Sequence, residues 1–254
     1  MRTRKLMNLL LLTILVSTLM LTGCCKQDDL TLDNPDYSQD KGEFKDTRDS
    51  KVYKWVKIGD QIWMAENLNY TGNGIKQITN NTEWTNNSNY DGWCYYNNNS
   101  YYADTYGVLY QWEAAKKVCP DGWHLPTDKE WNKMEDYLIS HGYSYDGVVG
   151  NTYIAKSLAS YHGWPASSNT GFIGNTDYPE FINKTGFSAL PGGNRGDTGI
   201  FDVLGYGCDW WNATAYNDTV AYVHFMHYNY TGVYRSGKGI KTVGYSVRCV
   251  KNCY

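Results

Sequence analysis

Residues 119–131 read CPDGWHLPTDKEW, and this stretch decides the fold because a strong helix start follows a cysteine, a histidine and a tryptophan. Thr127 and Glu130 have the spacing of a capping box, in which each side chain satisfies an otherwise unpaired backbone N–H at a helix start. Apolar residues then recur at positions i, i+3 and i+7: Trp131, Met134 and Leu138. The pattern predicts a turn or strand leading into a helix that ends near residue 140 and buries one face.

The N-terminal residues 1–23 have the pattern of a secretory signal. A basic start precedes an apolar run over residues 6–21 that is too short and wrongly flanked for a transmembrane helix. Small residues just before Cys24 resemble a bacterial lipobox, so we expect Cys24 to be lipidated after cleavage. The alternative is an ordinary signal peptide with an incidental cysteine. The acyl chains would anchor the protein to a membrane without spanning it.

Residues 24–50 are polar and charged, with few large apolar side chains, and we interpret them as a flexible tether. The acidic start of this segment resembles the export tag that carries lipoproteins to the outer face in Bacteroidetes, although a solvated tether explains it equally well. We therefore expect a protein lipid-anchored at the cell outer membrane and exposed at the surface. Residues 51–254 suit one domain with a sizeable core.

The composition indicates short strands, turns and long loops rather than a helix bundle. The chain contains 24 Tyr, 10 Trp and 25 Gly, residues that are typical of strands and turns. The net charge of −3 argues against nucleic acid as a partner, because no basic stripe is present to neutralise phosphates.

Local patterns predict an α+β domain in which two main helices precede short antiparallel strands. The first element is a hairpin with strands at 56–58 and 61–64 around a Gly-Asp turn. Helices are expected at 108–118 and 127–140, with a weaker one at 153–158, and residues 69–105 are expected to be a long loop region. Short strands are expected at 186–190, 208–214, 221–225 and 244–250, with a turn at 191–195.

Six sequence blocks then occur in a recognisable order. They are WMAENLNY at 63–70, G-x-LY-x-W at 107–112, CP-x-GWHLPT at 119–127, GFSALPGG at 186–193, WW-x-AT at 210–214 and SVRCV at 246–250. The series resembles the Fibrobacter succinogenes major paralogous domain of exported proteins and covers about residues 52–251. The family commonly has a second cysteine before Gly107, where this chain has Tyr101–Asp104, which leaves the partner of Cys94 open.

The resemblance implies a C-type-lectin-like fold, which this family shares with the formylglycine-generating enzyme group. In such folds a cysteine before the main helix pairs with one in the last strand, which here implies a Cys119–Cys249 disulfide. That bridge would close a loop of about 130 residues, worth roughly 4–5 kcal/mol in the chain-entropy model. Cys94 would then be left to pair with Cys208 or Cys253.

The same resemblance bears on whether Cys119 is a nucleophile with His124 as its base. A catalytic cysteine needs a depressed pKa and no disulfide partner, and no group that would orient His124 is evident. We interpret the opening stretch as architecture. Because Cys249 is the expected structural partner, the oxidase activity of the formylglycine-generating relatives is not carried over either.

Other reactive groups form no recognisable site. His224 and His227 lie three apart on a predicted strand and point to opposite faces, so we interpret them as surface histidines rather than a metal pair. No motif selects two catalytic carboxylates among Asp197, Asp202, Asp209 and Asp218. The calcium-site motifs of lectins are also missing. We therefore expect no catalysis, no metal and no cofactor.

Residues 194–238 combine many Tyr and Asn side chains, the balance of rigid contact area and adaptable hydrogen bonding that antibody loops use. The predicted ligand-binding residues are Asn194, Arg195, Trp211, Tyr216, Asn217, Tyr228, Tyr230 and Tyr234, with the loops at 84–102 as a further candidate. The leading hypothesis is a binding module for an extracellular glycan or protein. The alternatives are an enzyme or enzyme accessory acting on extracellular polysaccharide and a structural envelope protein.

Overall fold

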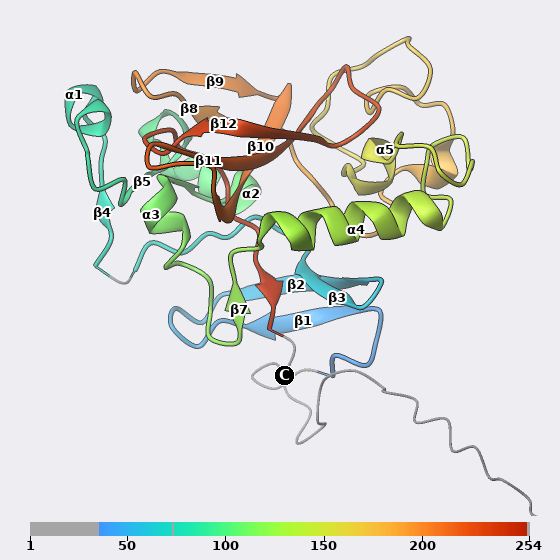
Figure 1. Cartoon of the computed structure of the whole chain (residues 1–254), viewed down its shortest axis with the longest axis horizontal. Coiled ribbons are helices and arrows are strands. Elements are labelled where there is room, and N and C mark those ends of the chain that lie inside the picture. Colours follow the sequence, from blue (N-terminus) through green and yellow to red (C-terminus); the bar gives the residue numbers. More distant parts are fainter. Residues whose placement is uncertain (1–35, 73, 253–254) are drawn as a thin grey trace, which may run out of the picture.

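The structure is a computed structural model that describes residues 36–72 and 74–252 and shows a mixed α+β architecture (Figure 1). The predicted signal peptide, Cys24 and the start of the predicted tether lie outside the described residues. Three sheets are present in the described part, with strand orders β1-β2-β3-β13-β7, β12-β11-β10-β8-β9 and β4-β5-β6. Within that part, no helix has the length and apolar character needed to cross a bilayer.

The first sheet contains the predicted hairpin. Its strands are β1 (Lys41–Lys45), β2 (Val52–Ile58), β3 (Gln61–Met64), β7 (Trp123–His124) and β13 (Val250–Lys251). β2 and β3 pair antiparallel around the Gly-Asp turn, where Gly59 has a φ of +62° that favours glycine. The hairpin prediction is confirmed.

The tether prediction is wrong from Lys41 onward, because β1 pairs with β2 along its whole length. Phe44 supplies the anchor: it is buried and stacks on Trp123 with ring centroids 4.5 Å apart. Beyond the strand, Asp46 is buried and forms an ion pair with Arg48, whose guanidinium also donates to the Val118 carbonyl. One apolar side chain and one ion pair thus dock a segment whose composition is that of a linker.

The predicted main helix is confirmed as α4 (Asp128–Ser140). Thr127 and Glu130 form the capping box, and Trp131, Met134 and Leu138 are buried. Figure 1 shows α4 between the first sheet and the second sheet. The Trp131 ring reaches both, with centroids 4.9 Å from Trp63 of β3 and 5.7 Å from Trp210 of β10.

The second sheet is built from β8 (Gly192–Arg195), β9 (Phe201–Leu204), β10 (Gly207–Ala215), β11 (Val220–His227) and β12 (Tyr234–Ile240). The strands predicted at 208–214 and 221–225 are confirmed as β10 and β11. The turn predicted at 191–195 is wrong, because β8 occupies it. Glycine is needed here because the backbones of β8 and β9 approach closely: a Cβ on Gly193 would lie 2.6 Å from the Asp202 carbonyl oxygen.

Two other strand predictions hold only in part. Residues 186–190 form a single bridge, between Ala189 and Ala159. Residues 244–250 form isolated bridges before the short β13, and Ser246 to Val250 are all buried rather than alternately exposed. This segment runs between packed elements on both sides, so period-2 alternation does not describe it.

The third sheet and several short helices replace the loop region predicted for 69–105. These elements are β4 (Lys76–Gln77), α1 (Asn81–Thr85), β5 (Gly92–Cys94), η1 (Tyr96–Asn98), η2 (Ser100–Tyr102), α2 (Ala103–Tyr106) and β6 (Leu109–Tyr110). The helix predicted at 108–118 is reduced to α3 (Trp112–Ala115), because β6 pairs with β5. The weak helix at 153–158 is α5 (Ala155–Leu158), and η3 (Pro179–Phe181) follows. Trp84 and Trp93 are buried, so these two rings are core residues.

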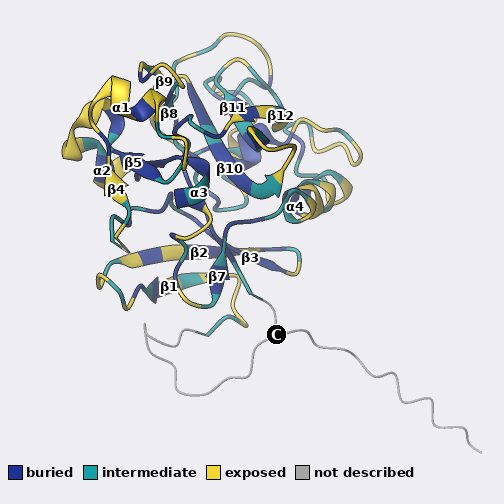
Figure 2. Ribbon diagram, turned by 60° about the vertical axis from the view of Figure 1, so that its left-hand side comes forward, coloured by how far each residue is buried: buried dark blue, intermediate teal, exposed yellow. Residues whose placement is uncertain are grey.

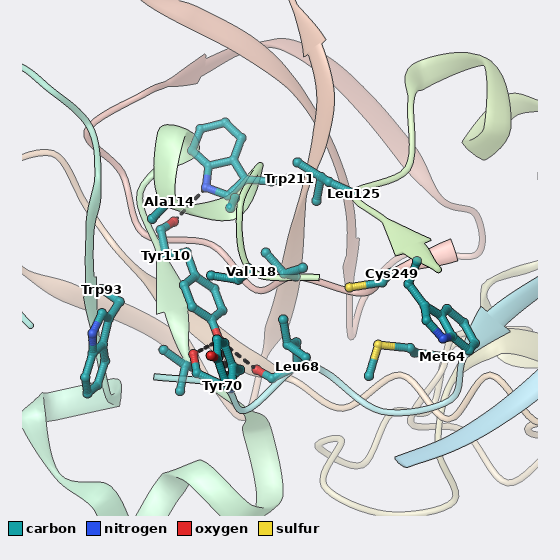
Figure 3. Close-up of a cluster of buried hydrophobic side chains, with 14 of the residues drawn as sticks. Met64, Leu68, Tyr70, Trp93, Tyr110, Ala114, Val118, Leu125, Trp211 and Cys249 are labelled. Carbon is teal, nitrogen blue, oxygen red and sulfur yellow. Dashed lines mark hydrogen bonds between the residues drawn. The ribbon is translucent and has the colours of Figure 1, made fainter. Parts of the chain in front are cut away.

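The Cys119–Cys249 disulfide is confirmed, with the two Cα atoms 5.9 Å apart and a sequence separation of 130. Cys94 and Cys208 are both buried free thiols, which excludes their pairing with each other here. Cys253 lies outside the described residues. Around Cys249 the core is dominated by large side chains, and Figure 3 shows Trp211 donating from Nε1 to the Tyr110 carbonyl at 2.7 Å.

Candidate functional site

The second sheet has two faces of different character. Along β10 and β11, side chains alternate between a face that packs on α4 and the opposite face. On the α4 face, Cys208, Trp210, His224 and Met226 are at most 1% exposed. On the opposite face, Asp209, Phe225 and His227 are half-buried. Figure 2 shows the buried character of β10 against the exposed outer side of α4.

The α4 face is core, and here the surface-histidine prediction for His224 is wrong. The His224 ring stacks on Trp131 with centroids 4.7 Å apart and planes 9° from parallel. Its Nε2 lies 3.6 Å from a carboxylate oxygen of Glu135. Burial favours the neutral form of both groups, lowering the pKa of His224 to about 3 and raising the pKa of Glu135 to about 8.

The opposite face carries one row of side chains that crosses all five strands. Asp202 of β9 pairs with Asn194 of β8, whose Nδ2 donates to Asp209 Oδ2 of β10 at 3.0 Å. Asp209 is directly opposite Phe225 of β11, which is directly opposite Tyr234 of β12. Directly paired residues share a face, so the row has a polar half and an aromatic half.

The aromatic half continues into neighbouring rings, which form what we call the aromatic surface: Tyr206, Phe225, His227, Tyr228, Tyr230 and Tyr234. Phe225 stacks with Tyr234 at 5.8 Å, and Tyr230 lies 4.5 Å from Tyr234 and 5.6 Å from His227. Tyr228 extends the series by contacting His227 at 4.9 Å and Tyr206 at 5.4 Å. Each ring of the aromatic surface is thus in contact with at least one other ring of it.

The polar half has an unusual carboxyl group. Burial raises the pKa of Asp209 to about 6, with the hydrogen bond from Asn194 and the charge of His227 acting in the opposite direction. Asp202, which is exposed, adds a like charge that raises the pKa further. At neutral pH Asp209 is therefore an ionised acceptor whose charge is lost in mildly acidic conditions.

Four of the predicted ligand-binding residues lie on this face: Asn194, Tyr228, Tyr230 and Tyr234. Asp209, Phe225 and His227 were not among the predicted residues. Their signal is the alternation within β10 and β11, because polar or aromatic side chains at 209, 225 and 227 follow buried ones at 208, 224 and 226.

Arg195 and Trp211 are removed from the predicted site by burial. The Arg195 guanidinium donates to the carbonyls of Ile78 and Thr79 and lies 4.3 Å from the Trp84 ring centroid, so it fastens the second sheet to residues 78–84. Trp211 is fully buried in the core. Both side chains are enclosed by the core and are not exposed on the face that carries the aromatic surface.

Tyr216 and Asn217 belong to the turn between β10 and β11. Asn217 Oδ1 accepts from the backbone N–H groups of Thr219 and Val220, which makes it a turn-forming residue. Tyr216 is 61% exposed and contacts Tyr222, which lies on the α4 face of β11 together with His224. The structure thus separates both residues from the aromatic surface.

In the part of the chain that the structure describes, no group of three or more His, Cys, Asp or Glu side chains could hold a metal ion. At Cys119 the sulfur is in the disulfide. Nearby, His124 is bound on both sides, by Glu130 at 2.7 Å and by Asn252. Both belong to the architecture around the helix start.

Comparison with curated proteins and with solved structures finds no match. The model of the Fibrobacter succinogenes major domain family matches residues 56–251, which is most of the chain and includes every strand from β3 to β13. The chain belongs to the Fibrobacter succinogenes major domain family.

Proposed function

We propose that this protein is a non-catalytic binding module that captures extracellular glycan on the aromatic surface and the adjoining polar row. The observation that carries the proposal is the row across the second sheet, in which Asn194 and Asp209 adjoin Phe225 and Tyr234. Sugars present apolar C–H faces and rings of hydroxyl groups, and this row offers an aromatic platform and hydrogen-bonding groups side by side.

The physical basis is low reorganisation cost. Tyr side chains give large contact areas with few rotatable bonds, and here neighbouring rings already hold them. Asp209 accepts hydrogen bonds from hydroxyl groups when ionised, and its partner Asn194 fixes its orientation. A ligand therefore gains contacts without paying much ordering entropy.

We also propose where the protein is located. A lipidated Cys24 would tether the domain to the outer membrane with the aromatic surface available to extracellular ligands. The C-type-lectin-like fold is proposed in the same way, from the block pattern and from the disulfide that joins the start of α4 to the last strand.

A glycan array probed with the full-length protein in detergent tests this function. Tyr230→Ala and Tyr234→Ala should each weaken capture of the best glycan by roughly tenfold or more, as expected for central aromatic contacts. Tyr216→Ala is the matched control, since it removes an exposed tyrosine outside the aromatic surface. Equal losses for all three variants, or an array without any bound glycan, would count against the proposal.

The enzyme alternative has one supporting observation, the raised pKa of Asp209 beside the charge of Asp202. A carboxyl group with a raised pKa is typical of the general acid in glycosidases. Asp209→Asn distinguishes the two functions. If the protein releases reducing sugar from a polysaccharide and this substitution stops the release while capture persists, the module is an enzyme.

A further inference from the structure

A groove of about 580 Å³ opens where segments distant in sequence meet, and it shares no residue with the aromatic surface. Five segments supply residues to its walls. They are 51–54 at the start of β2, 65–69, 103–107 in α2 and just after it, and the loops at 160–162 and 188–190. Arg248 completes the lining. The volume is within the range of small-molecule sites.

Arg248 is the distinctive group of the groove, because it is a fully buried cation held only by neutral acceptors. Nε and Nη2 donate to Asn67 Oδ1 at 3.2 Å and 3.0 Å, and Nη1 donates to the Phe187 carbonyl. The guanidinium also lies 4.1 Å from the Phe187 ring centroid. Asn67 is itself fixed by accepting from Trp210 and donating to Tyr106. The fork is therefore held in one orientation.

Arg248 forms no ion pair among the described residues. The charge of Glu66, on the same wall, acts on Arg248 and offsets part of the effect of burial, but Glu66 is also paired with Lys54 at 3.8 Å. Burial lowers the pKa of Arg248 to about 9, so the guanidinium stays protonated at neutral pH but is poorly compensated. Buried charges normally have an ionic partner, because desolvation is costly.

The rest of the lining is balanced in charge. Lys51 and Lys54 are offset by Glu66 and Asp104, so the net positive charge of the groove is that of Arg248. The Ser160 and Ser188 hydroxyls already donate to the carbonyls of His162 and Gly186. A planar guanidinium matches a carboxylate in geometry as well as in charge.

We infer that this groove is a second ligand site, which binds a small organic carboxylate with its anionic group directed at Arg248. The inference is independent of the proposed glycan-binding function. It rests on the lining of the groove, the fixed guanidinium and the lack of an ion pair to Arg248 among the described residues.

Isothermal titration calorimetry on the full-length protein at pH 7 and low salt tests the site with a matched pair of probes. D-glucuronate carries a carboxylate where D-glucose carries a hydroxymethyl group. Glucuronate should bind at least ~10-fold more tightly than glucose, because only it completes a charge-assisted hydrogen bond. Equal affinity for the two sugars, or binding of inorganic phosphate without binding of glucuronate, overturns the inference.

Substitutions locate the binding. Glu66→Gln removes the competing carboxylate from the wall, and glucuronate affinity should rise by roughly 3–10-fold at low salt. Glu83→Gln removes a carboxylate that is paired with Lys76 outside the groove, and affinity should not change. Arg248→Lys keeps the charge but loses the fork and should weaken glucuronate binding by about tenfold or more.

Because Arg248 is buried, its variant can fail to fold, and the Glu66→Gln result then decides the matter. Tyr234→Ala separates the two proposed sites, since it should leave glucuronate affinity unchanged. Loss of glucuronate binding in Tyr234→Ala, or unchanged affinity in Glu66→Gln, contradicts the groove.

Discussion

The two faces of the second sheet carry histidines only three residues apart, yet the side chains have opposite fates. His224 is sealed between β11 and α4, whereas His227 stands among half-exposed tyrosines. The strand is the same and the residue type is the same. The difference lies in what packs against each face: α4 covers the face with His224, whereas nothing in the described chain fully covers the opposite face around His227. The burial of a side chain on this sheet therefore depends on the element packed against its face and not on the strand that carries it.

The largest expected difference between the faces is in stability. Trp131→Ala empties the contact between α4 and β10 and should lower the free energy of unfolding by about 3–5 kcal/mol. Tyr234→Ala, on the open face where the ring is 45% exposed, should cost less than about 1 kcal/mol. Urea denaturation followed by tryptophan fluorescence measures both. Similar losses would mean that the open face is also core.

The next difference is in the response to acid. Because the pKa of His224 is lowered from 6.5 to about 3 in the folded protein, the unfolded chain takes up a proton first, and stability falls as the pH drops below 6.5. The loss approaches about 1.4 kcal/mol per pH unit between pH 6 and pH 4. Glu135 acts in the opposite sense, since its raised pKa costs stability as the pH rises from 4.5 towards 8.

His224→Phe keeps a ring against Trp131 and removes this titration while Glu135 still acts, so the unfolding free energy of the variant should rise relative to that of the parent as the pH is lowered from 7 to 4. His227→Phe is the matched control on the other face and should keep the parent slope. A parent-like slope in His224→Phe would show that His224 is not the group responsible.

The smallest effect is expected in ligand capture by the open face. The pKa of Asp209 is raised to about 6, so its carboxylate is present above that pH and lost below it. If glycan hydroxyl groups donate hydrogen bonds to Asp209, the affinity for the glycan should fall about tenfold or less between pH 7 and pH 5. Asp209→Asn should bind weakly at both pH values. A pH dependence that survives this substitution assigns the effect to another group.

Local signals in the sequence predicted local structure well. The capping box at Thr127 and the Gly-Asp hairpin turn each depend on residues a few positions apart, and both are present as expected. The aromatic and Asn-rich character of 194–238 predicted a ligand-binding surface in this part of the chain, and that function stays a prediction. Four of the eight predicted residues lie on one face of the second sheet, whereas Arg195 and Trp211 are buried.

Apart from the disulfide that the family resemblance implied, features that depend on distant partners were not predicted. Arg195 and Trp211 were assigned to a ligand site, but residues 78–84 and Tyr110 bury them. Lys41–Lys45 has the composition of a linker and becomes a strand because β2 offers an edge and Trp123 offers a ring. The groove at Arg248 has no local signature at all, since its walls are brought together by tertiary packing.

The disulfide has a consequence for resistance to proteolysis. Cys119 precedes β7 and Cys249 precedes β13, and these two strands pair with each other. Because the two sulfurs are bonded, the chain from Cys119 to Cys249 forms a covalent ring. The aromatic surface lies on this ring. A protease that cuts once in a loop such as 161–178 produces two fragments that stay linked until the sulfurs are reduced. A non-reducing gel would show one band and a reducing gel two, and the nicked molecule would keep the aromatic surface attached.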